Sequence, residues 1–266
     1  MDFIKQIFDD GIDNSRDTDR RTIGFEKQSG ERTISSPIAH VELHASHLQQ
    51  NRIVAHKKSD PRTAAYDMLR TRLLREMHMR DWKTLAITSP TAESGKTLTS
   101  INLALSISHS TTNSATLVDF DLRRPTIAKY LGLPTDLRSV AECFDGNARI
   151  SDVMVSPGFP NFVVLPNFFP IQNAAETLAS DRTDRIIEEL ADQHPDEIVI
   201  LDLPPILEVD DTLSVLPKVD CVLLVVAAGQ STANQIKECR RLLKPYNLIG
   251  TVLNKSDAKS NQYDYY

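Results

Sequence analysis

The sequence has few cysteines and no apolar run long enough to cross a membrane. Its 266 residues include three cysteines, Cys143, Cys221 and Cys239, whose scattered positions lack the spacing of a metal site. Two of them lie within predicted elements, and we expect these two to act as small buried apolar residues in a reducing cytosol. The longest apolar run, residues 222–228, is far shorter than the roughly 20 residues that a membrane-spanning helix needs.

The chain also lacks an excess of basic residues and a secretory signal. Its formal net charge is −6, which argues against bulk binding of nucleic acid. The first residues, Met1-Asp2-Phe3-Ile4-Lys5, do not show a basic region followed by an apolar core. Apolar residues make up 41% and charged residues 25% of the chain, as in soluble globular proteins. We therefore expect a cytoplasmic protein.

The composition divides the chain into three parts. Residues 1–58 are expected to form a flexible N-terminal segment, because residues 9–36 are polar and charged with few apolar anchors. Residues 59–255 are expected to form one domain. Residues 256–266 form a polar tail that ends in tyrosines.

Within the domain, short apolar segments alternate with helical ones. The predicted strands are short, rich in β-branched residues and almost continuously apolar: 84–88, 115–119, 162–165, 198–202, 221–226 and 249–253. Helical patterns cover 61–79, 96–110, 181–193 and 232–244. Strands of this kind are typical of a parallel sheet buried on both faces. The alternation predicts an α/β fold, with a doubly wound, mostly parallel sheet and helices on both faces.

The first motif is a loop that ends in Gly95-Lys96-Thr97, between a predicted strand and a predicted helix. In such a loop, backbone N–H groups and the helix N-terminus hold phosphate oxygens. Lys96 reaches the β- and γ-phosphates, and the Thr97 hydroxyl is a ligand of Mg²⁺. The match is imperfect, because Pro90 stands where the general pattern has glycine. Taken alone, an ordinary strand–helix turn explains it equally well.

Acidic residues end two other predicted strands. Asp119 and Asp121 follow one strand two positions apart, and Asp202 ends another. Near a Mg²⁺-bound triphosphate, one carboxylate holds the metal and another accepts a proton from an attacking hydroxyl. The alternative is structural, with Asp121 capping a helix and Asp202 capping a turn. Ligands of doubly wound sheets bind at the carboxyl ends of the strands, where all three motifs fall.

Asn254-Lys255-Ser256-Asp257 follows the last predicted strand. This is the pattern with which GTPases read guanine, but four residues in a polar segment are weak evidence. We expect Asn254 near a nucleotide base, with ATP or GTP preference left open.

The motifs together resemble those of the bacterial tyrosine kinases (BY-kinases) of the CpsD/CapB type, which act in exopolysaccharide synthesis. The resemblance spans residues 51–266. It includes residues 64–72, the phosphate-binding loop, Val118-Asp119-Phe120-Asp121-Leu122-Arg123-Arg124-Pro125, Asp202-Leu203-Pro204-Pro205 and the tail tyrosines Tyr263, Tyr265 and Tyr266. It implies the P-loop NTPase fold of the MinD and ParA proteins. Relatives of the partitioning type carry an additional lysine at the position of Thr91.

The resemblance implies an ATP- and Mg²⁺-dependent protein-tyrosine autokinase that regulates exopolysaccharide or capsule chain length or export. It implies nucleotide binding by Glu93, Ser94, Gly95, Lys96, Thr97 and Leu98, catalysis by Lys96, Asp119, Asp121 and Asp202, and metal binding by Thr97, Asp119 and Asp202. The acceptors are Tyr263, Tyr265 and Tyr266, usually of a neighbouring subunit in a homo-oligomer. A separate membrane chain-length protein recruits the kinase to the inner face of the membrane and activates it, and a phosphotyrosine phosphatase is a further partner.

Two positions depart from the family pattern. Glu93 replaces a glycine, and a left-handed conformation there costs a non-glycine residue about 1–2 kcal/mol. In the first helix, the ring-forming pattern Glu-x-x-Arg-x-x-Arg falls on Ala64, Asp67 and Arg70, so only its last arginine remains. Two other functions stay open: a non-catalytic nucleotide-binding regulator of the membrane protein, and a partitioning-type ATPase or GTPase.

Overall fold

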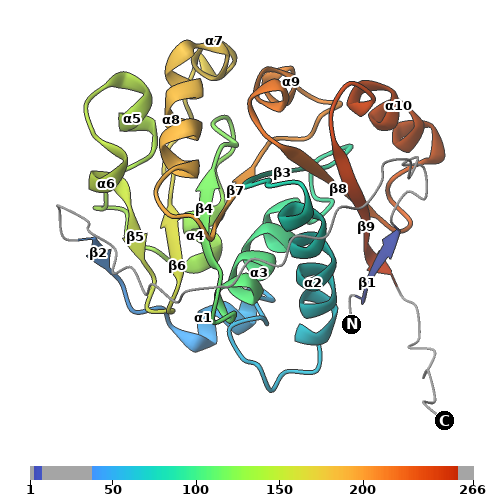
Figure 1. The fold of residues 1–266 in the computed structure, drawn as a ribbon, viewed down its shortest axis with the longest axis horizontal. Coiled ribbons are helices and arrows are strands. Elements are labelled where there is room, and N and C mark those ends of the chain that lie inside the picture. The colour runs from blue at the N-terminus through green and yellow to red at the C-terminus, as the bar shows by residue number, and fades with distance from the viewer. Residues whose placement is uncertain (1–2, 8–37, 257–266) are drawn as a thin grey trace, which may run out of the picture.

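The computed structural model describes residues 3–7 and 38–256, and a nine-stranded sheet crosses it in the order β1-β9-β8-β3-β7-β4-β6-β5-β2 (Figure 1). The strands are β1 Phe3–Ile7, β2 Ala39–His40, β3 Thr84–Thr88, β4 Ser114–Asp119, β5 Val155–Ser156, β6 Phe162–Leu165, β7 Glu197–Asp202, β8 Cys221–Ala227 and β9 Leu248–Ser256. The run from β9 to β6 is parallel throughout, whereas β1 pairs with β9 and β5 with β6 in antiparallel fashion. The six strands predicted from the sequence are these six parallel strands.

Helices cover both faces of the sheet, so the predicted doubly wound fold is confirmed (Figure 1). They are α1 Ala45–Gln50, α2 Thr63–Met79, α3 Lys96–Ser108, α4 Ile127–Leu131, α5 Ala141–Asp145, α6 Ile150–Val153, α7 Ala174–Ala179, α8 Asp181–Ala191, α9 Asp211–Val215, the 3₁₀ helix η1 Leu216–Lys218 and α10 Ala233–Leu243. Side chains of a strand point alternately to its two faces. Leu85 and Ile87 accordingly pack in the cluster under α2 and α3, and Ala86 packs in the cluster under α8 and α10.

The predicted helix over 61–79 is α2, and it lies against α3 (Figure 1). Leu69, Leu73 and Met77, four residues apart, are fully buried. Arg70 bonds Asp67 Oδ1 at 3.0 Å and the carbonyl oxygen of Ser106 at 2.8 Å, while the Ser106 hydroxyl donates to Asp67 Oδ1 at 2.6 Å. The remaining arginine of the ring pattern therefore joins α2 to α3 within one chain.

The prediction that residues 1–58 form a flexible segment is wrong for the last third of that segment. Residues 38–58 contain β2 and α1, and Leu48, Ile53 and Ala55 belong to the core. The Asn102 side-chain oxygen accepts hydrogen bonds from the Val54 and Ala55 N–H groups at 2.8 and 2.9 Å. A buried apolar run of three residues has neither strand nor helix periodicity, and the sequence prediction therefore missed it. The remainder of the expected flexible segment, apart from β1, lies outside the described residues.

The strands that carry the motifs end at the same edge of the sheet. In the parallel register, Asp202 lies opposite Asp119 on one side and Ile87 on the other. The phosphate-binding loop therefore starts beside the two acidic strand ends. β9 continues one residue beyond the predicted domain end, to Ser256. Within the described residues, every helix is too short or too polar to span a bilayer.

Candidate functional site

The loop between β3 and α3 has the left-handed backbone that a phosphate cradle requires. Glu93 has φ 60° and Gly95 has φ 90°. The Ser94 hydroxyl donates to the Thr91 carbonyl oxygen at 2.9 Å, which closes the turn. A β-carbon placed on Gly95 would lie 2.0 Å from Asn254 Nδ2. The one glycine of the loop is therefore required twice, by its conformation and by the close approach of β9.

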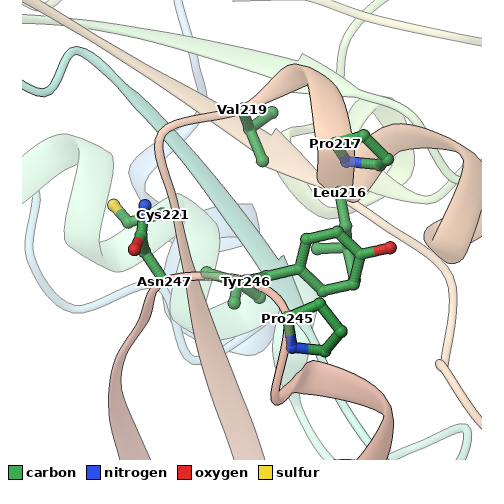
Figure 2. Close-up of a pocket in the computed structure, with 8 residues that line it drawn as sticks. Leu216, Pro217, Val219, Cys221, Pro245, Tyr246 and Asn247 are labelled. Atoms are coloured by element: carbon green, nitrogen blue, oxygen red, sulfur yellow. The ribbon is translucent and has the colours of Figure 1, made fainter.

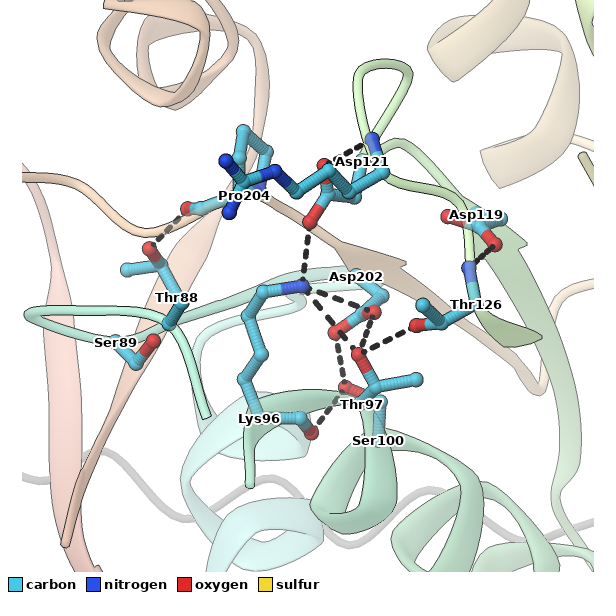
Figure 3. A network of polar contacts seen from close by, with 12 residues as sticks. Thr88, Ser89, Lys96, Thr97, Ser100, Asp119, Asp121, Thr126, Asp202 and Pro204 are labelled. Atoms are coloured by element: carbon cyan, nitrogen blue, oxygen red, sulfur yellow. Dashed lines mark hydrogen bonds and ion pairs between the residues drawn. The ribbon is translucent and has the colours of Figure 1, made fainter. Parts of the chain in front are cut away.

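Lys96 lies at the centre of a polar network (Figure 3). Its ammonium group is 2.9 Å from Asp121 Oδ2 and 3.4 Å from Asp202 Oδ2. Burial alone would lower the pKa of Lys96, but the nearby carboxylates of Asp202 and Asp121 outweigh it and raise the pKa. Lys96 therefore remains charged, and in this structure its charge is directed at acids of the same chain.

Asp202 is held by three groups of helix α3. The hydroxyl of Thr97 donates to its Oδ2 at 2.6 Å and the hydroxyl of Ser100 to its Oδ1 at 3.0 Å (Figure 3). Lys96 supplies the third contact. Burial raises the pKa of Asp202 despite these favourable contacts. Ser100 was missed in the sequence, although it lies one helical turn after Lys96 on the same face.

Asp119 is fully buried beside Asp202 and uses only one of its oxygens. Its Oδ2 accepts hydrogen bonds from the N–H groups of Thr126 and Ile127, both at 3.0 Å. Its Oδ1 is buried and has no hydrogen-bond partner among the described residues. Burial, reinforced by the charge of Asp202, raises the pKa of Asp119 well above its ordinary value. A buried carboxylate oxygen without a partner is costly unless something else satisfies it.

These groups fit a magnesium ion. Mg²⁺ prefers oxygen ligands and usually binds through one or two carboxylates together with phosphates and water. The Thr97 hydroxyl, the unpaired oxygen of Asp119 and the Asp202 carboxylate are oxygen donors at one strand edge. Three carboxylates, with Asp121, face a single lysine here. A divalent cation would balance the charge that Lys96 leaves uncompensated.

A cleft of about 760 Å³ opens above this network. It is lined by Glu93, Gly95, Lys96, Thr97, Leu98, Asp121 and Asn254 from the set predicted in the sequence. The other three predicted residues, Ser94, Asp119 and Asp202, are buried and do not line the cleft. All residues predicted for nucleotide, metal and catalysis therefore lie in or directly beneath one cavity.

Glu208 is a cleft residue that the sequence did not indicate. Its carboxylate accepts a hydrogen bond from the Ala92 N–H group at 2.6 Å. An N–H group of the phosphate-binding loop is thus already bound to an anion of the same chain. The chain leaves β7 through Pro204-Pro205, and this extended exit brings Glu208 back to the loop.

Both ends of the Asn254 amide are hydrogen-bonded, one of them to the phosphate-binding loop. Its Nδ2 donates to the Ser94 carbonyl oxygen at 3.0 Å, and its Oδ1 accepts from the Lys255 N–H group at 2.9 Å. The side chain is 5% exposed. The first bond fastens β9 to the phosphate-binding loop, and Asn254 also lines the cleft.

A second pocket lies at the opposite edge of the sheet, where β8 begins (Figure 2). Its volume is about 330 Å³, and the described residues that line it include Leu216, Tyr246 and Cys221 but no charged side chain. The phosphate-handling residues are absent from its walls. Tyr263, Tyr265 and Tyr266, the predicted acceptors, lie outside the described residues.

The comparisons with known proteins agree with the geometry. No family model matches the chain. The tyrosine-protein kinase CpsD of Streptococcus pneumoniae is 28% identical over 183 residues, covering 68% of this chain and 79% of CpsD. The putative tyrosine-protein kinase CapB of Staphylococcus aureus is 28% identical over 188 residues, covering 69% and 81%. The putative tyrosine-protein kinase EpsB of Ralstonia solanacearum is 29% identical over 211 residues, which cover 77% of this chain but only 27% of EpsB.

Comparison with solved structures shows the same similarity in the three-dimensional fold. The kinase domain of the Escherichia coli tyrosine kinase ETK matches with a TM-score of 0.72 and 27% identity over 86% of this chain and 93% of that domain. The chain is similar to the bacterial tyrosine kinases in both sequence and fold. The fold is shared with the septum site-determining protein MinD of Pyrococcus horikoshii. The match has a TM-score of 0.55 and 19% identity, and it covers 64% of this chain and 68% of MinD. The resemblance and the P-loop NTPase fold expected from the sequence are both confirmed.

Proposed function

We propose that this chain transfers the γ-phosphoryl group of ATP to protein tyrosine residues. The observation that carries the proposal is the Lys96 network, in which a phosphate-binding loop meets three carboxylates at one strand edge. The homology to tyrosine-protein kinases gives the acceptor class. Phosphoryl transfer is catalysed mainly by positioning and by neutralising charge, which this arrangement provides.

Each group has a distinct role in the proposed reaction. The backbone N–H groups of the loop and the Lys96 ammonium bind the phosphates. Thr97, Asp119 and Asp202 would hold Mg²⁺, which supplies positive charge to the phosphate oxygens. The tyrosine oxygen attacks the γ-phosphorus, the bond to the β–γ bridging oxygen breaks, and ADP leaves. Asp121, which lines the cleft, takes the proton of the tyrosine hydroxyl.

During the proposed reaction, the Lys96 ammonium group must exchange its contacts with Asp121 and Asp202 for contacts with the phosphates. In the structure Asp121 and Lys96 form an ion pair, so the proposed base is also the partner of the phosphate-binding lysine. Phosphates that attract Lys96 release Asp121 to accept a proton. The acceptors we propose are Tyr263, Tyr265 and Tyr266 of a neighbouring subunit.

The cellular setting belongs to the same proposal. The family likeness supports a homo-oligomer in the cytoplasm, recruited to the inner face of the membrane by a separate chain-length determinant whose cytoplasmic tail activates it. A phosphotyrosine phosphatase would reverse the modification. The process would be the control of exopolysaccharide or capsule chain length or export.

A second function, nucleotide binding without transfer, is favoured by two observations. Glu208 occupies the Ala92 N–H group, and Glu93 places a carboxylate on the left-handed loop position. Both weaken a phosphate site. A partitioning-type ATPase or GTPase is less well supported, because Thr91 stands where those relatives carry an additional lysine.

The test is incubation of the full-length protein with ATP and Mg²⁺, with and without the cytoplasmic tail of the membrane partner, followed by intact-mass analysis and mapping of phosphotyrosine. We expect additions of one phosphate each on the tail tyrosines. Binding of Mg-ATP without any phosphotyrosine, even with the partner present, would establish the non-catalytic regulator.

Lys96→Met is the matched variant. It should weaken Mg-ATP binding more than about tenfold, because a charge-assisted contact to phosphate is lost. It also leaves Asp202 and Asp121 without their cation, so a thermal melt must accompany the titration. Lys96→Arg retains the charge and separates the two effects. Equal nucleotide affinities of the wild type and folded Lys96→Met would exclude a nucleotide site in this loop.

A further inference from the structure

Arg124 differs from the other cations that line the cleft. The other four already have partners in the chain: Lys96, Arg123, Lys255 and Arg52. Arg124 is exposed, and no described residue pairs with its guanidinium group. The contrast with its neighbour is direct, since Arg123 is fixed by two bonds of 2.8 and 2.9 Å to the fully buried Asp211.

The backbone of Arg124 is attached to the proposed proton acceptor. Its N–H group donates to Asp121 Oδ1 at 3.0 Å. An acceptor tyrosine whose hydroxyl reaches Asp121 must therefore bring its neighbouring residues close to Arg124. An arginine at this place can bind a carboxylate on the acceptor with two parallel hydrogen bonds.

An exposed aromatic ring belongs to the same edge of the sheet. Phe169 is 68% exposed and lies in the segment that leaves β6. Two residues later, the Ile171 N–H group donates to the Leu122 carbonyl oxygen at 2.8 Å. This bond ties the Phe169 segment to the turn that carries Asp121 and Arg124. The other two large apolar side chains exposed in the described residues, Met68 and Met79, are on α2.

We propose that Arg124 and Phe169 form an acceptor-recognition surface for the segment Tyr263-Asp264-Tyr265-Tyr266 of a second copy of this chain. This inference rests on the proposed kinase function and adds the substrate sequence that the site selects. The Asp264 carboxylate binds Arg124, and a tyrosine beside the reacting one packs on the Phe169 ring. The surface thus selects tyrosines that have an acid and an aromatic residue next to them.

The topology favours the tail of a second copy over the chain's own tail. β9, which precedes the tail, is separated from β4 by three strands, so the two lie about 19 Å apart at about 4.8 Å per strand. The eight residues from Ser256 to Asp264 span at most about 28 Å when fully extended. The chain's own tail can cover this distance, but only by crossing β8, β3 and β7 at the edge with the phosphate-binding loop, where the nucleotide must bind. A tail from another copy has no such restriction.

The test compares the affinities of two tail peptides for variants of the protein, and it does not depend on phosphoryl transfer. Fluorescent peptides of residues 258–266, with and without Asp264→Asn, are titrated by anisotropy with the full-length protein and Mg-ADP. The protein carries Asp264→Asn and Phe at its three tail tyrosines, which limits competition from its own tail. Arg124→Gln should weaken binding of the Asp264 peptide about fivefold and of the Asp264→Asn peptide less than about twofold.

Phe169→Ala should weaken both peptides about fivefold, and Phe169→Tyr should retain binding. Arg241→Gln, an equal charge change on the exposed face of α10, is the control and should change neither affinity. Equal losses for the two peptides in Arg124→Gln would overturn the inference and assign Arg124 to phosphate. Peptide that does not bind would overturn it as well.

A transfer assay separates this inference from the kinase proposal. The same variants are supplied with ATP, Mg²⁺, the cytoplasmic tail of the membrane partner and the two peptides, and peptide phosphorylation is followed. If the peptide affinities change as expected in the titrations but no phosphotyrosine forms, the kinase function is rejected and the recognition surface is retained. Phosphorylation that is indifferent to Arg124→Gln, Phe169→Ala and Asp264→Asn would retain the kinase and reject the surface.

Discussion

Glu93 gives the most informative substitution in the phosphate-binding loop, because two different effects can be separated there. Its φ of 60° costs a non-glycine residue about 1–2 kcal/mol. Glycine removes that cost but loses about 0.5–1 kcal/mol more backbone entropy on folding. We therefore expect Glu93→Gly to raise the free energy of unfolding by about 0.5–1 kcal/mol, and Glu93→Gln to leave it nearly unchanged.

Nucleotide affinity should respond differently. The free protein already has the left-handed conformation, so its cost cancels between the free and bound states if the loop keeps this shape. The charge does not cancel. A unit charge about 4 Å from another in a water-like medium contributes about 1 kcal/mol, which is about fivefold in affinity. Both Glu93→Gly and Glu93→Gln should therefore tighten Mg-ATP binding about fivefold, less at high salt.

Calorimetric titration of Mg-ATP and urea unfolding of the full-length protein measure the two effects independently. Glu189→Gln, an exposed glutamate of α8 that does not line the cleft, is the control. Tighter binding by Glu93→Gly alone would refute the cancellation and show that the loop changes conformation on binding. No change in either variant would refute the electrostatic reasoning.

Three further predictions follow from individual contacts. Glu208→Gln weakens the anionic competitor on the Ala92 N–H group and should tighten Mg-ATP binding several-fold in the same titration. Asn102→Ala leaves the buried N–H groups of residues 54 and 55 without an acceptor and should cost about 2–4 kcal/mol in urea unfolding, with nucleotide affinity retained. Burial raises the pKa of the Cys143 thiol to about 12, so a thiol reagent should label it slowly at pH 8 and rapidly in denaturant.

The parallel strands were predictable because burial on both faces leaves a nearly continuous apolar run in the sequence. β3 and β6 have the predicted bounds, and β4 and β7 each begin one residue earlier. The α-helices that were missed have four to six residues, such as α4, α6 and α9. One and a half turns cannot show a helical period, and their positions are decided by contacts between distant parts of the chain.

The site was predictable where its chemistry is concentrated in motifs at strand ends. Lys96, Asp119, Asp121 and Asp202 converge because parallel strands of one sheet end at one edge. Glu208 was not predictable, since it follows no strand directly and has no motif around it. Its contact depends on how the chain folds back after β7.

The asparagine of the Asn254-Lys255-Ser256-Asp257 pattern has a structural role in this protein. The expected position of Asn254 near a nucleotide base stays a prediction; in the structure it lines the cleft, and its amide also bonds Ser94 and Lys255. Gly95 explains why this position favours a short amide: the Asn254 side chain lies where any β-carbon at Gly95 would be. The two positions therefore depend on each other. Gly95 leaves space because it has no β-carbon, and the Asn254 amide occupies that space and donates to the Ser94 carbonyl oxygen. A loop whose shape is fixed in this way holds its N–H groups in position before any phosphate arrives, which reduces the entropy that binding must overcome.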